Sequence, residues 1–139
     1  MSIIVLPKLS YRLMSILFDI QNELGPSLLE KHYQRAIEEE LENQRLNFER
    51  EKPVQITYKN KKLGIYYLDF VVENLIILEI KAQQYYSPKF FKQAYSYLKE
   101  LNLPLAIIVN FRGNKIRYKR IVNPLFKDVD LQNKDEPFE

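Results

Sequence analysis

The stretch Leu75-Ile76-Ile77-Leu78-Glu79-Ile80-Lys81-Ala82 decides how this chain is interpreted. Its apolar residues predict a buried β-strand, yet it also carries a carboxylate and an ammonium group two positions apart. Because side chains alternate along a strand, Glu79 and Lys81 share one face of the sheet. Buried charges are costly unless they are paired or bind a cation, so this strand is predicted to belong to a functional site.

A second apolar run, Tyr66-Tyr67-Leu68-Asp69-Phe70-Val71-Val72, precedes this strand and contains a single acid. The two runs predict a β-hairpin, and the length of its turn decides whether the acids meet. A two-residue turn places Asp69 and Glu79 on opposite faces, because a shift of one residue reverses every side chain. A three-residue turn places Asp69 directly opposite Glu79.

We predict the three-residue turn Glu73-Asn74-Leu75, which pairs Val72 with Ile76. Hairpin loops of this length are common, and Asn tolerates the left-handed backbone conformation that they need. The same register predicts that Tyr67 lies opposite Lys81. Facing Cβ atoms lie about 5 Å apart, so both carboxylates would reach one cation.

Two facing carboxylates and a nearby lysine suit a magnesium site that acts on phosphate esters. Mg²⁺ prefers one or two carboxylates together with water and phosphate oxygens. The backbone carbonyl of Ile80, between Glu79 and Lys81, is a further candidate ligand. Lys81 is expected to orient a water or to stabilise developing negative charge. The alternative is a Glu79–Lys81 ion pair on a half-exposed strand, with Asp69 solvated.

Length and composition predict one domain over residues 1–126 and an acidic, flexible tail over residues 127–139. The chain has 139 residues and a formal charge of +3. The tail contains five acids and two lysines, so the body is mildly basic, which permits nucleic-acid binding. The chain has no cysteine, and we expect neither a signal peptide nor a membrane span, which fits a cytoplasmic protein.

The periodicity of apolar residues predicts the order α-α-β-β-β-α-β-β. Helices are expected over residues 9–24, 26–46 and 88–101, with Gly25 ending the first, Pro26 starting the second and Ser87 as N-cap of the third. Strands are expected over residues 53–58, 63–72, 75–82, 104–109 and 115–122. The hairpins are antiparallel and the β-α-β segment is parallel, so we expect a mixed α/β fold with a central mixed sheet flanked by helices.

Three segments of this chain together resemble the PD-(D/E)XK nuclease superfamily. Asp69, followed after nine residues by Glu79-Ile80-Lys81, is similar to its D…(D/E)-x-K core. The segment Gly25-Pro26-Ser27-Leu28-Leu29-Glu30-Lys31-His32-Tyr33 resembles the one that names its GxxExxY group. Ile108-Val109-Asn110-Phe111 resembles a later segment. The resemblance spans about residues 13–122 and implies a restriction-endonuclease-like fold.

The resemblance also implies roles for individual residues. Asp69 and Glu79 would be metal ligands, and Lys81 the catalytic lysine. Glu30 matches a glutamate that approaches the metal, and Gln93 matches the start of a Gln-x-x-x-Tyr element that ends at Tyr97. Alternation places three further cations on one strand face, where they are candidates to bind phosphates or form an ordinary solvated edge: Lys115, Arg117 and Lys119.

The function expected from these residues is hydrolysis of DNA by an enzyme that depends on Mg²⁺ or Mn²⁺. The alternative is a catalytically silent module with the nuclease fold, which binds nucleic acid or a protein partner. A homodimer is also considered, since two copies of a domain of this size could cut both strands as a pair, although no sequence feature demands one. Fold alone does not decide between activity and binding.

Overall fold

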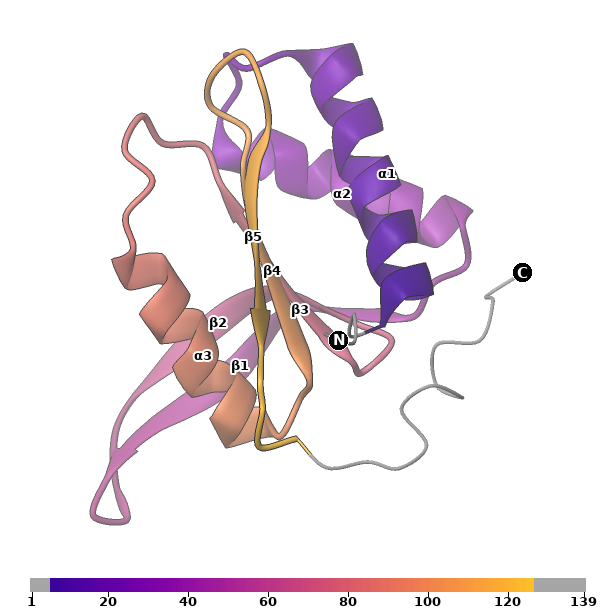
Figure 1. Ribbon diagram of the computed structural model, residues 1–139. Coiled ribbons are helices and arrows are strands. Elements are labelled where there is room, and N and C mark those ends of the chain that lie inside the picture. The colour runs from indigo at the N-terminus through magenta and orange to yellow at the C-terminus, as the bar shows by residue number, and fades with distance from the viewer. Residues whose placement is uncertain (1–5, 127–139) are drawn as a thin grey trace.

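The computed structural model describes residues 6–126, in the predicted order α-α-β-β-β-α-β-β (Figure 1). The predicted acidic tail lies outside the described residues. None of the helices in the described part has the length and apolar character needed to cross a membrane. The elements are α1 (Pro7–Leu24), α2 (Glu30–Asn43), β1 (Phe48–Tyr58), β2 (Lys61–Val72), β3 (Ile76–Lys81), α3 (Lys89–Leu101), β4 (Leu105–Asn110) and β5 (Arg117–Val122).

A mixed five-stranded sheet forms the centre of the molecule, as predicted. Its strands lie in the order β1-β2-β3-β4-β5, with β3 and β4 parallel and the other neighbours antiparallel. Helices α1 and α2 cover one face, and α3 covers the other (Figure 1). The protein is therefore a three-layer α/β/α arrangement, in which β3 is the central strand.

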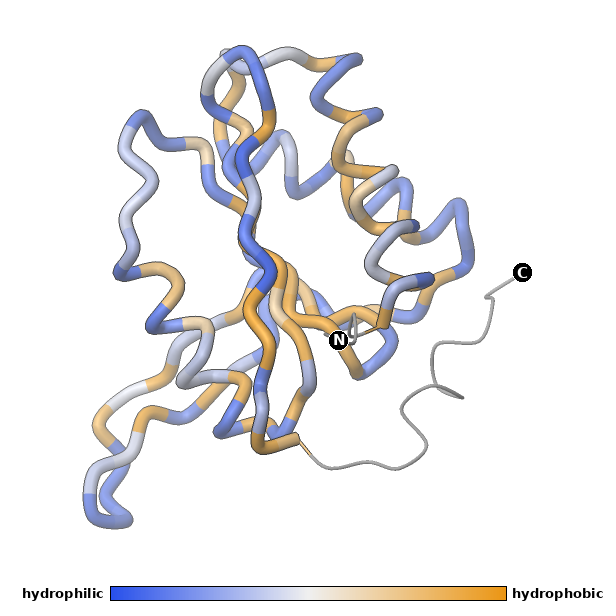
Figure 2. The backbone as a smooth tube through the Cα atoms, in the orientation of Figure 1, coloured by the Kyte–Doolittle hydropathy of each residue, from blue (hydrophilic) through white to orange (hydrophobic). Residues whose placement is uncertain are grey.

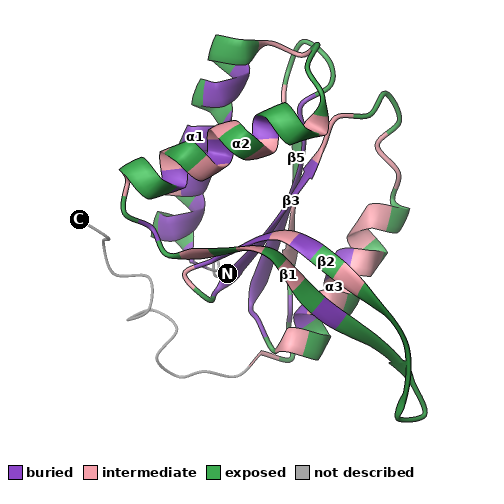
Figure 3. Cartoon of the chain, turned by 180° about the vertical axis from the view of Figure 1, so that it is seen from behind, coloured by how far each residue is buried: buried purple, intermediate pink, exposed green. Residues whose placement is uncertain are grey.

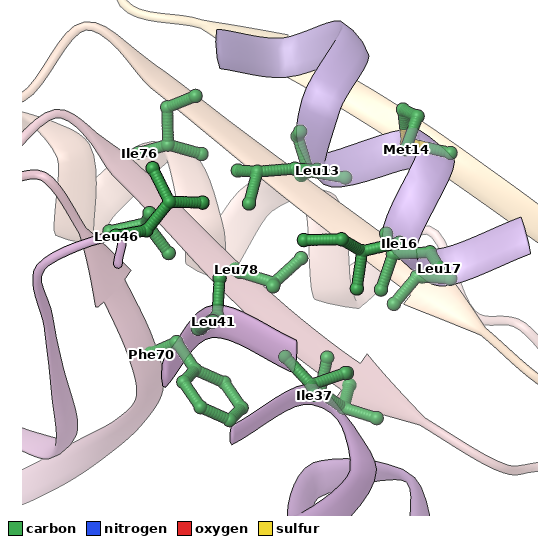
Figure 4. Close-up of a cluster of buried hydrophobic side chains, with 14 of the residues drawn as sticks. Leu13, Met14, Ile16, Leu17, Ile37, Leu41, Leu46, Phe70, Ile76 and Leu78 are labelled. Atoms are coloured by element: carbon green, nitrogen blue, oxygen red, sulfur yellow. The ribbon is translucent and has the colours of Figure 1, made fainter. Parts of the chain in front are cut away.

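Each face of the sheet has its own hydrophobic core. The α1/α2 core joins the helix pair to the sheet, and Figure 4 shows side chains from both helices meeting Phe70, Ile76 and Leu78. The α3 core lies on the opposite face and includes Ala94 and Leu98 of the helix. Because β3 and β4 are covered on both faces, their sequences are apolar almost throughout (Figure 2).

The hairpin register between β2 and β3 is the predicted one. Val72 pairs with Ile76, so the turn contains three residues. Glu73 and Asn74 both adopt left-handed backbone conformations, with φ of 53° each. The amide of Leu75 donates a hydrogen bond to the carbonyl of Val72 at 3.0 Å and closes the turn.

The second helix is shorter at both ends than the predicted span 26–46. It begins at Glu30, because residues 25–29 are held as a loop by Tyr33, whose hydroxyl donates to the Gly25 carbonyl at 2.5 Å. Pro26 therefore does not start the helix. The helix ends at Asn43, since Arg45 takes a left-handed conformation and the Leu46 amide donates to the Leu41 carbonyl.

Three strand and cap boundaries also differ from the prediction. The first strand begins at Phe48 instead of residue 53, because Phe48 pairs with Val72. The last strand begins at Arg117, two residues later than predicted. The N-cap of α3 is Pro88, while the Ser87 hydroxyl accepts a hydrogen bond from the Lys89 amide at 3.2 Å.

Candidate active site

The site is built where β2 separates from β3. The two strands pair through Val72, Val71 and Phe70, and the next position along β2 is Asp69. From Asp69 on, hydrogen bonds between backbone amides and side-chain carboxylates replace the backbone–backbone pairs. The Ile80 amide donates to Asp69 Oδ2 at 2.7 Å, and the Asp69 amide donates to Glu79 Oε1 at 3.0 Å. The structure thus brings the two predicted acids together across the hairpin.

The alternation of side chains along β2 changes at Asp69. Leu68 packs in the α3 core, whereas Phe70 packs in the α1/α2 core. A regular strand would place both on one face, because they are two residues apart. On the neighbouring strand β1, Glu51 has a φ of 51°, an uncommon value for a non-glycine residue. The regular alternation of side chains between the two faces of the sheet is therefore interrupted at Asp69.

This change of face brings Tyr66, and not Tyr67, into the site. The Tyr66 hydroxyl donates to Glu79 Oε2 at 3.1 Å. Tyr67 is 57% exposed and points away, so the prediction that it faces Lys81 is wrong. Tyr66 also stacks on Tyr97 of α3, with ring centroids 4.7 Å apart. The stacked rings hold the hydroxyl against the carboxylate.

The two carboxyl groups lie in surroundings that disfavour negative charge. Glu79 is 4% exposed. Its pKa rises to about 7, first because burial penalises the charged form and second because Asp69 repels it. Burial also raises the pKa of Asp69, and the charge of Glu30 adds to this, while the Ile80 amide, Lys81 and Arg50 oppose it. Burial and Glu79 raise the pKa of Tyr66, which keeps its hydroxyl a donor.

Lys81 and helix α3 form the second wall of the site. The Lys81 ammonium lies 4.5 Å from the ring centroid of Phe90, a cation–π contact. Gln93 and Tyr97, one helical turn apart, line a small cavity together with Lys81 and Glu79. Its volume is about 10 Å³, roughly one water position. The structure therefore places the predicted Gln-x-x-x-Tyr element beside the predicted acid and lysine.

Glu30 approaches the site from the other face of the sheet. It is the first residue of α2, and the loop before it is fixed by Tyr33, which stacks on Phe111 with centroids 4.3 Å apart. The negative charge of Glu30 raises the pKa of Asp69. No three His, Cys, Asp or Glu side chains within residues 6–126 are arranged as a metal site. Glu30 is therefore a neighbour of the acid pair and does not complete a three-acid cluster.

The predicted cationic strand lies on the α3 face. Arg117 lies 5.5 Å from the Tyr86 ring centroid, and Lys119 lies 5.7 Å from that of Phe91. Lys115 precedes the strand and, with Arg117, lines an open hollow of about 480 Å³. Both strand cations thus lie on the same side of the sheet as the Lys81 ammonium.

Three contributors to the site carry no clear sequence signal. Tyr66 is one of two consecutive tyrosines, and only the change of face at Asp69 selects it. Phe90 is in the apolar stripe of α3, as a core residue would be. Arg50 comes from a part of β1 that the periodicity does not predict as a strand.

Comparison with known proteins shows the family to which the chain belongs. A family model described as the PD-(D/E)XK nuclease superfamily matches residues 7–121. The crystal structure of SSO0001 is similar at a TM-score of 0.53 and 19% sequence identity, over 96% of this chain and 69% of that one. At this identity the likeness concerns the fold alone. Among curated proteins, none matches significantly. The family match covers most of the chain, which therefore belongs to the PD-(D/E)XK nuclease superfamily.

Proposed function

We propose that this protein is a nuclease that hydrolyses DNA phosphodiester bonds with the help of a divalent cation. The observation that carries the proposal is the pairing of Asp69 with Glu79 at the point where β2 and β3 separate. Lys81 follows on the same strand and lines the cavity into which Glu79 points. Two acids and a lysine thereby converge on one open end of the hairpin.

The donor set fits Mg²⁺ or Mn²⁺. Burial raises the pKa of both carboxyl groups, and the charge of Asp69 raises that of Glu79 further, so a cation bound between them would favour the charged form of each. Asp69, Glu79 and the Ile80 carbonyl would hold the ion, with Glu30 approaching from α2. When bound, the cation would offset charge on the scissile phosphate and lower the pKa of the attacking water.

The protein's own groups would position the reaction. Lys81 would donate hydrogen bonds to the attacking water and stabilise charge on the phosphate as the phosphorus–oxygen bond to the leaving group breaks. Tyr66 fixes the orientation of Glu79 through its hydroxyl. Gln93, on the wall of the same cavity, would contact the water or the phosphate, and Tyr97 would support the substrate.

Cations on the α3 face would bind the DNA backbone beyond the scissile phosphate. Arg117 and Lys119 are exposed, and each lies over an aromatic ring that restrains it. Lys115 extends this surface into the hollow at the start of β5. Contacts of this kind position a nucleic acid without reading its sequence.

We further propose that the chain belongs to the GxxExxY group of the superfamily. The segment from Gly25 to Tyr33 supports this assignment through Glu30 and Tyr33, while Ser27 stands where the pattern has its glycine. Tyr33 binds the loop through Gly25 and Leu28, and this loop sets the position at which Glu30 enters the helix.

A cleavage assay tests the proposed activity. Purified protein is incubated with plasmid and with linear duplex DNA in the presence of Mg²⁺ or Mn²⁺. Lys81→Ala and Asp69→Asn are each expected to reduce the rate by about 10²–10³-fold, because each removes a group that acts on the transition state. Lys99→Ala, on the exposed side of α3, is the matched control and should retain full activity. Cleavage that survives both active-site substitutions would refute the assignment.

A second function is favoured by one specific observation. Both carboxylates already accept backbone amides, as side chains do in a structural site. A catalytically silent module that binds nucleic acid or a protein partner would retain these bonds. Calorimetric titration separates the alternatives: the nuclease should bind Mn²⁺ at the acid pair, whereas the module should bind DNA or protein without it.

A further inference from the structure

The β1–β2 hairpin projects well beyond the body of the protein (Figures 1 and 3). Within residues 6–126, the pairing of β2 with β3 covers only Phe70–Val72, whereas its pairing with β1 continues to Tyr58–Lys61. Val54 and Tyr66, at the root, contact the α3 core. The part beyond them, residues 55–65, is a free two-stranded ribbon, called the arm below.

The charge of the hairpin is entirely positive over a long stretch. Residues 52–68 contain four lysines and no acid. Lys52 is paired with Glu49 at 2.8 Å, at the base of the hairpin. The remaining three, Lys59, Lys61 and Lys62, gather at the tip and are exposed. The tip therefore has the charge that complements a polyanion.

The hairpin also exposes apolar side chains that a free ribbon has no structural reason to carry. Leu63, Ile65 and Tyr67 alternate along one face of β2 and are 66%, 52% and 57% exposed. On β1, Ile56 and Tyr58 are 41% and 59% exposed. Exposed apolar groups gathered beside cations mark an interaction site, because neither is buried by the fold.

We propose that the arm is a grip for duplex DNA, lying in a groove of the substrate about one helical turn from the scissile phosphate. The major groove of B-DNA admits a two-stranded β-ribbon. The tip at Asn60 lies nine positions before Asp69 along the strand, which spans about 30 Å at ~3.3 Å per residue. One turn of B-DNA is about 34 Å. The tip lysines would contact phosphates, and the apolar stripe would contact sugars and base methyl groups.

The alternative partner for the arm is a second copy of the chain, because β1 is an edge strand to which another strand could add. Two features disfavour it. Pro53 lacks a backbone N–H and interrupts the hydrogen bonds that a further strand would need. Like-charged tips repel one another, and edge lysines are a common device against strand addition. The arm therefore suits DNA better than another copy.

This inference deepens the proposed function, and it rests on that function for placing the scissile phosphate at Asp69. The test is binding in EDTA, where no cleavage occurs. Fluorescence anisotropy measures the affinity for a labelled duplex over a series of salt concentrations. In the arm variant, Lys59, Lys61 and Lys62 are changed to Gln. The matched control changes three exposed cations of α2 and its following turn to Gln: Lys31, Arg35 and Arg45.

The arm variant is expected to lose affinity and to reduce the slope of log K against log salt by about 2–3, since each phosphate contact contributes ~0.9. A second variant, Leu63→Ser with Ile65→Ser, should bind more weakly with an unchanged slope. The control should match the wild type, and circular dichroism checks the fold of every variant. Arm variants that bind duplex as tightly as the wild type would overturn the inference. So would light scattering that shows the wild type as a dimer and the arm variant as a monomer.

Different results would refute the proposed nuclease activity and the proposed DNA grip. Metal-dependent cleavage with no effect of the arm variant would refute the grip and leave the nuclease standing. Duplex binding through the arm, with no cleavage in Mg²⁺ or Mn²⁺, would refute the nuclease and leave the grip standing.

Discussion

The substitution Glu79→Gln isolates the free-energy cost of keeping a carboxylate in this site. The amide has the shape of the carboxyl group. Its oxygen can accept the Asp69 amide, and its nitrogen can donate to the Tyr66 hydroxyl, so both hydrogen bonds of Glu79 have a substitute. What the variant removes is the buried negative charge beside Asp69.

The expected gain follows from the pKa of Glu79, which rises from 4.5 to about 7 on folding. Each tenfold change in proton affinity corresponds to ~1.4 kcal/mol, so the charged form costs about 3 kcal/mol in the folded protein. The folded state keeps the proton that the unfolded state has already lost, and wild-type stability therefore falls as pH rises from 4.5 to 7. The variant should be more stable than the wild type by about 3 kcal/mol above that range.

The assay is urea unfolding followed by far-ultraviolet circular dichroism, in EDTA, from about pH 4 to about pH 8. The difference between variant and wild type should grow across this interval and then level off. Glu39→Gln, on the exposed face of α2, is the control and should change stability little at any pH. A Glu79→Gln protein that is equally or less stable than the wild type at the alkaline end would refute the reasoning.

Three further substitutions test separate parts of the structure. Tyr66→Phe removes the hydroxyl that donates to Glu79 Oε2, so the pKa of Glu79 should rise further and the acidic limb of the pH–rate profile of cleavage should move up by about one pH unit. Leu78→Ala opens a cavity in the α1/α2 core, where Leu78 is fully buried, and should lower the free energy of unfolding in urea by about 2–5 kcal/mol. Tyr33→Phe releases the Gly25 carbonyl and should cost about 1–3 kcal/mol in the same assay.

Each expectation has a contrary result. An unchanged pH profile in Tyr66→Phe would show that the hydroxyl does not stabilise the charged form of Glu79. A loss of less than about 1 kcal/mol in Leu78→Ala would contradict the close packing of the helices on β3. Tyr33→Phe with wild-type stability would mean that the loop before α2 is held by other contacts.

The register of the central hairpin was predictable because it depends on local chemistry. Glu73 and Asn74 supply the two left-handed residues of a three-residue turn, and the turn length fixes which residues of β2 and β3 face each other. The pairing of Val72 with Ile76 follows from this alone. The convergence of Asp69 and Glu79 was accessible from sequence for the same reason.

The change of face at Asp69 was not predictable, because it depends on long-range structure. It arises where β2 leaves β3 yet remains paired with β1, and periodicity gives no sign of where two strands separate. Tyr66 therefore replaces Tyr67 in the site. The start of α2 was missed for a related reason, since the hydrogen bond from Tyr33 to Gly25 spans eight residues and overrides the usual preference for Pro at a helix start.

The periodicity of apolar residues also could not predict that the arm is exposed. Leu63, Ile65 and Tyr67 alternate as the residues of a covered strand do, and the sequence pattern is the same whether or not a helix packs on them. Only the arrangement of the sheet shows that this part of the hairpin extends beyond α3.

The central claim is that Asp69 and Glu79 together hold a divalent cation, and anomalous diffraction from crystals soaked in Mn²⁺ tests it most directly. The account predicts an anomalous peak between the two carboxylates in the wild-type protein, and its loss in Asp69→Asn crystals treated in the same way. Wild-type crystals without a peak at this pair, or a peak that persists in Asp69→Asn, would contradict it.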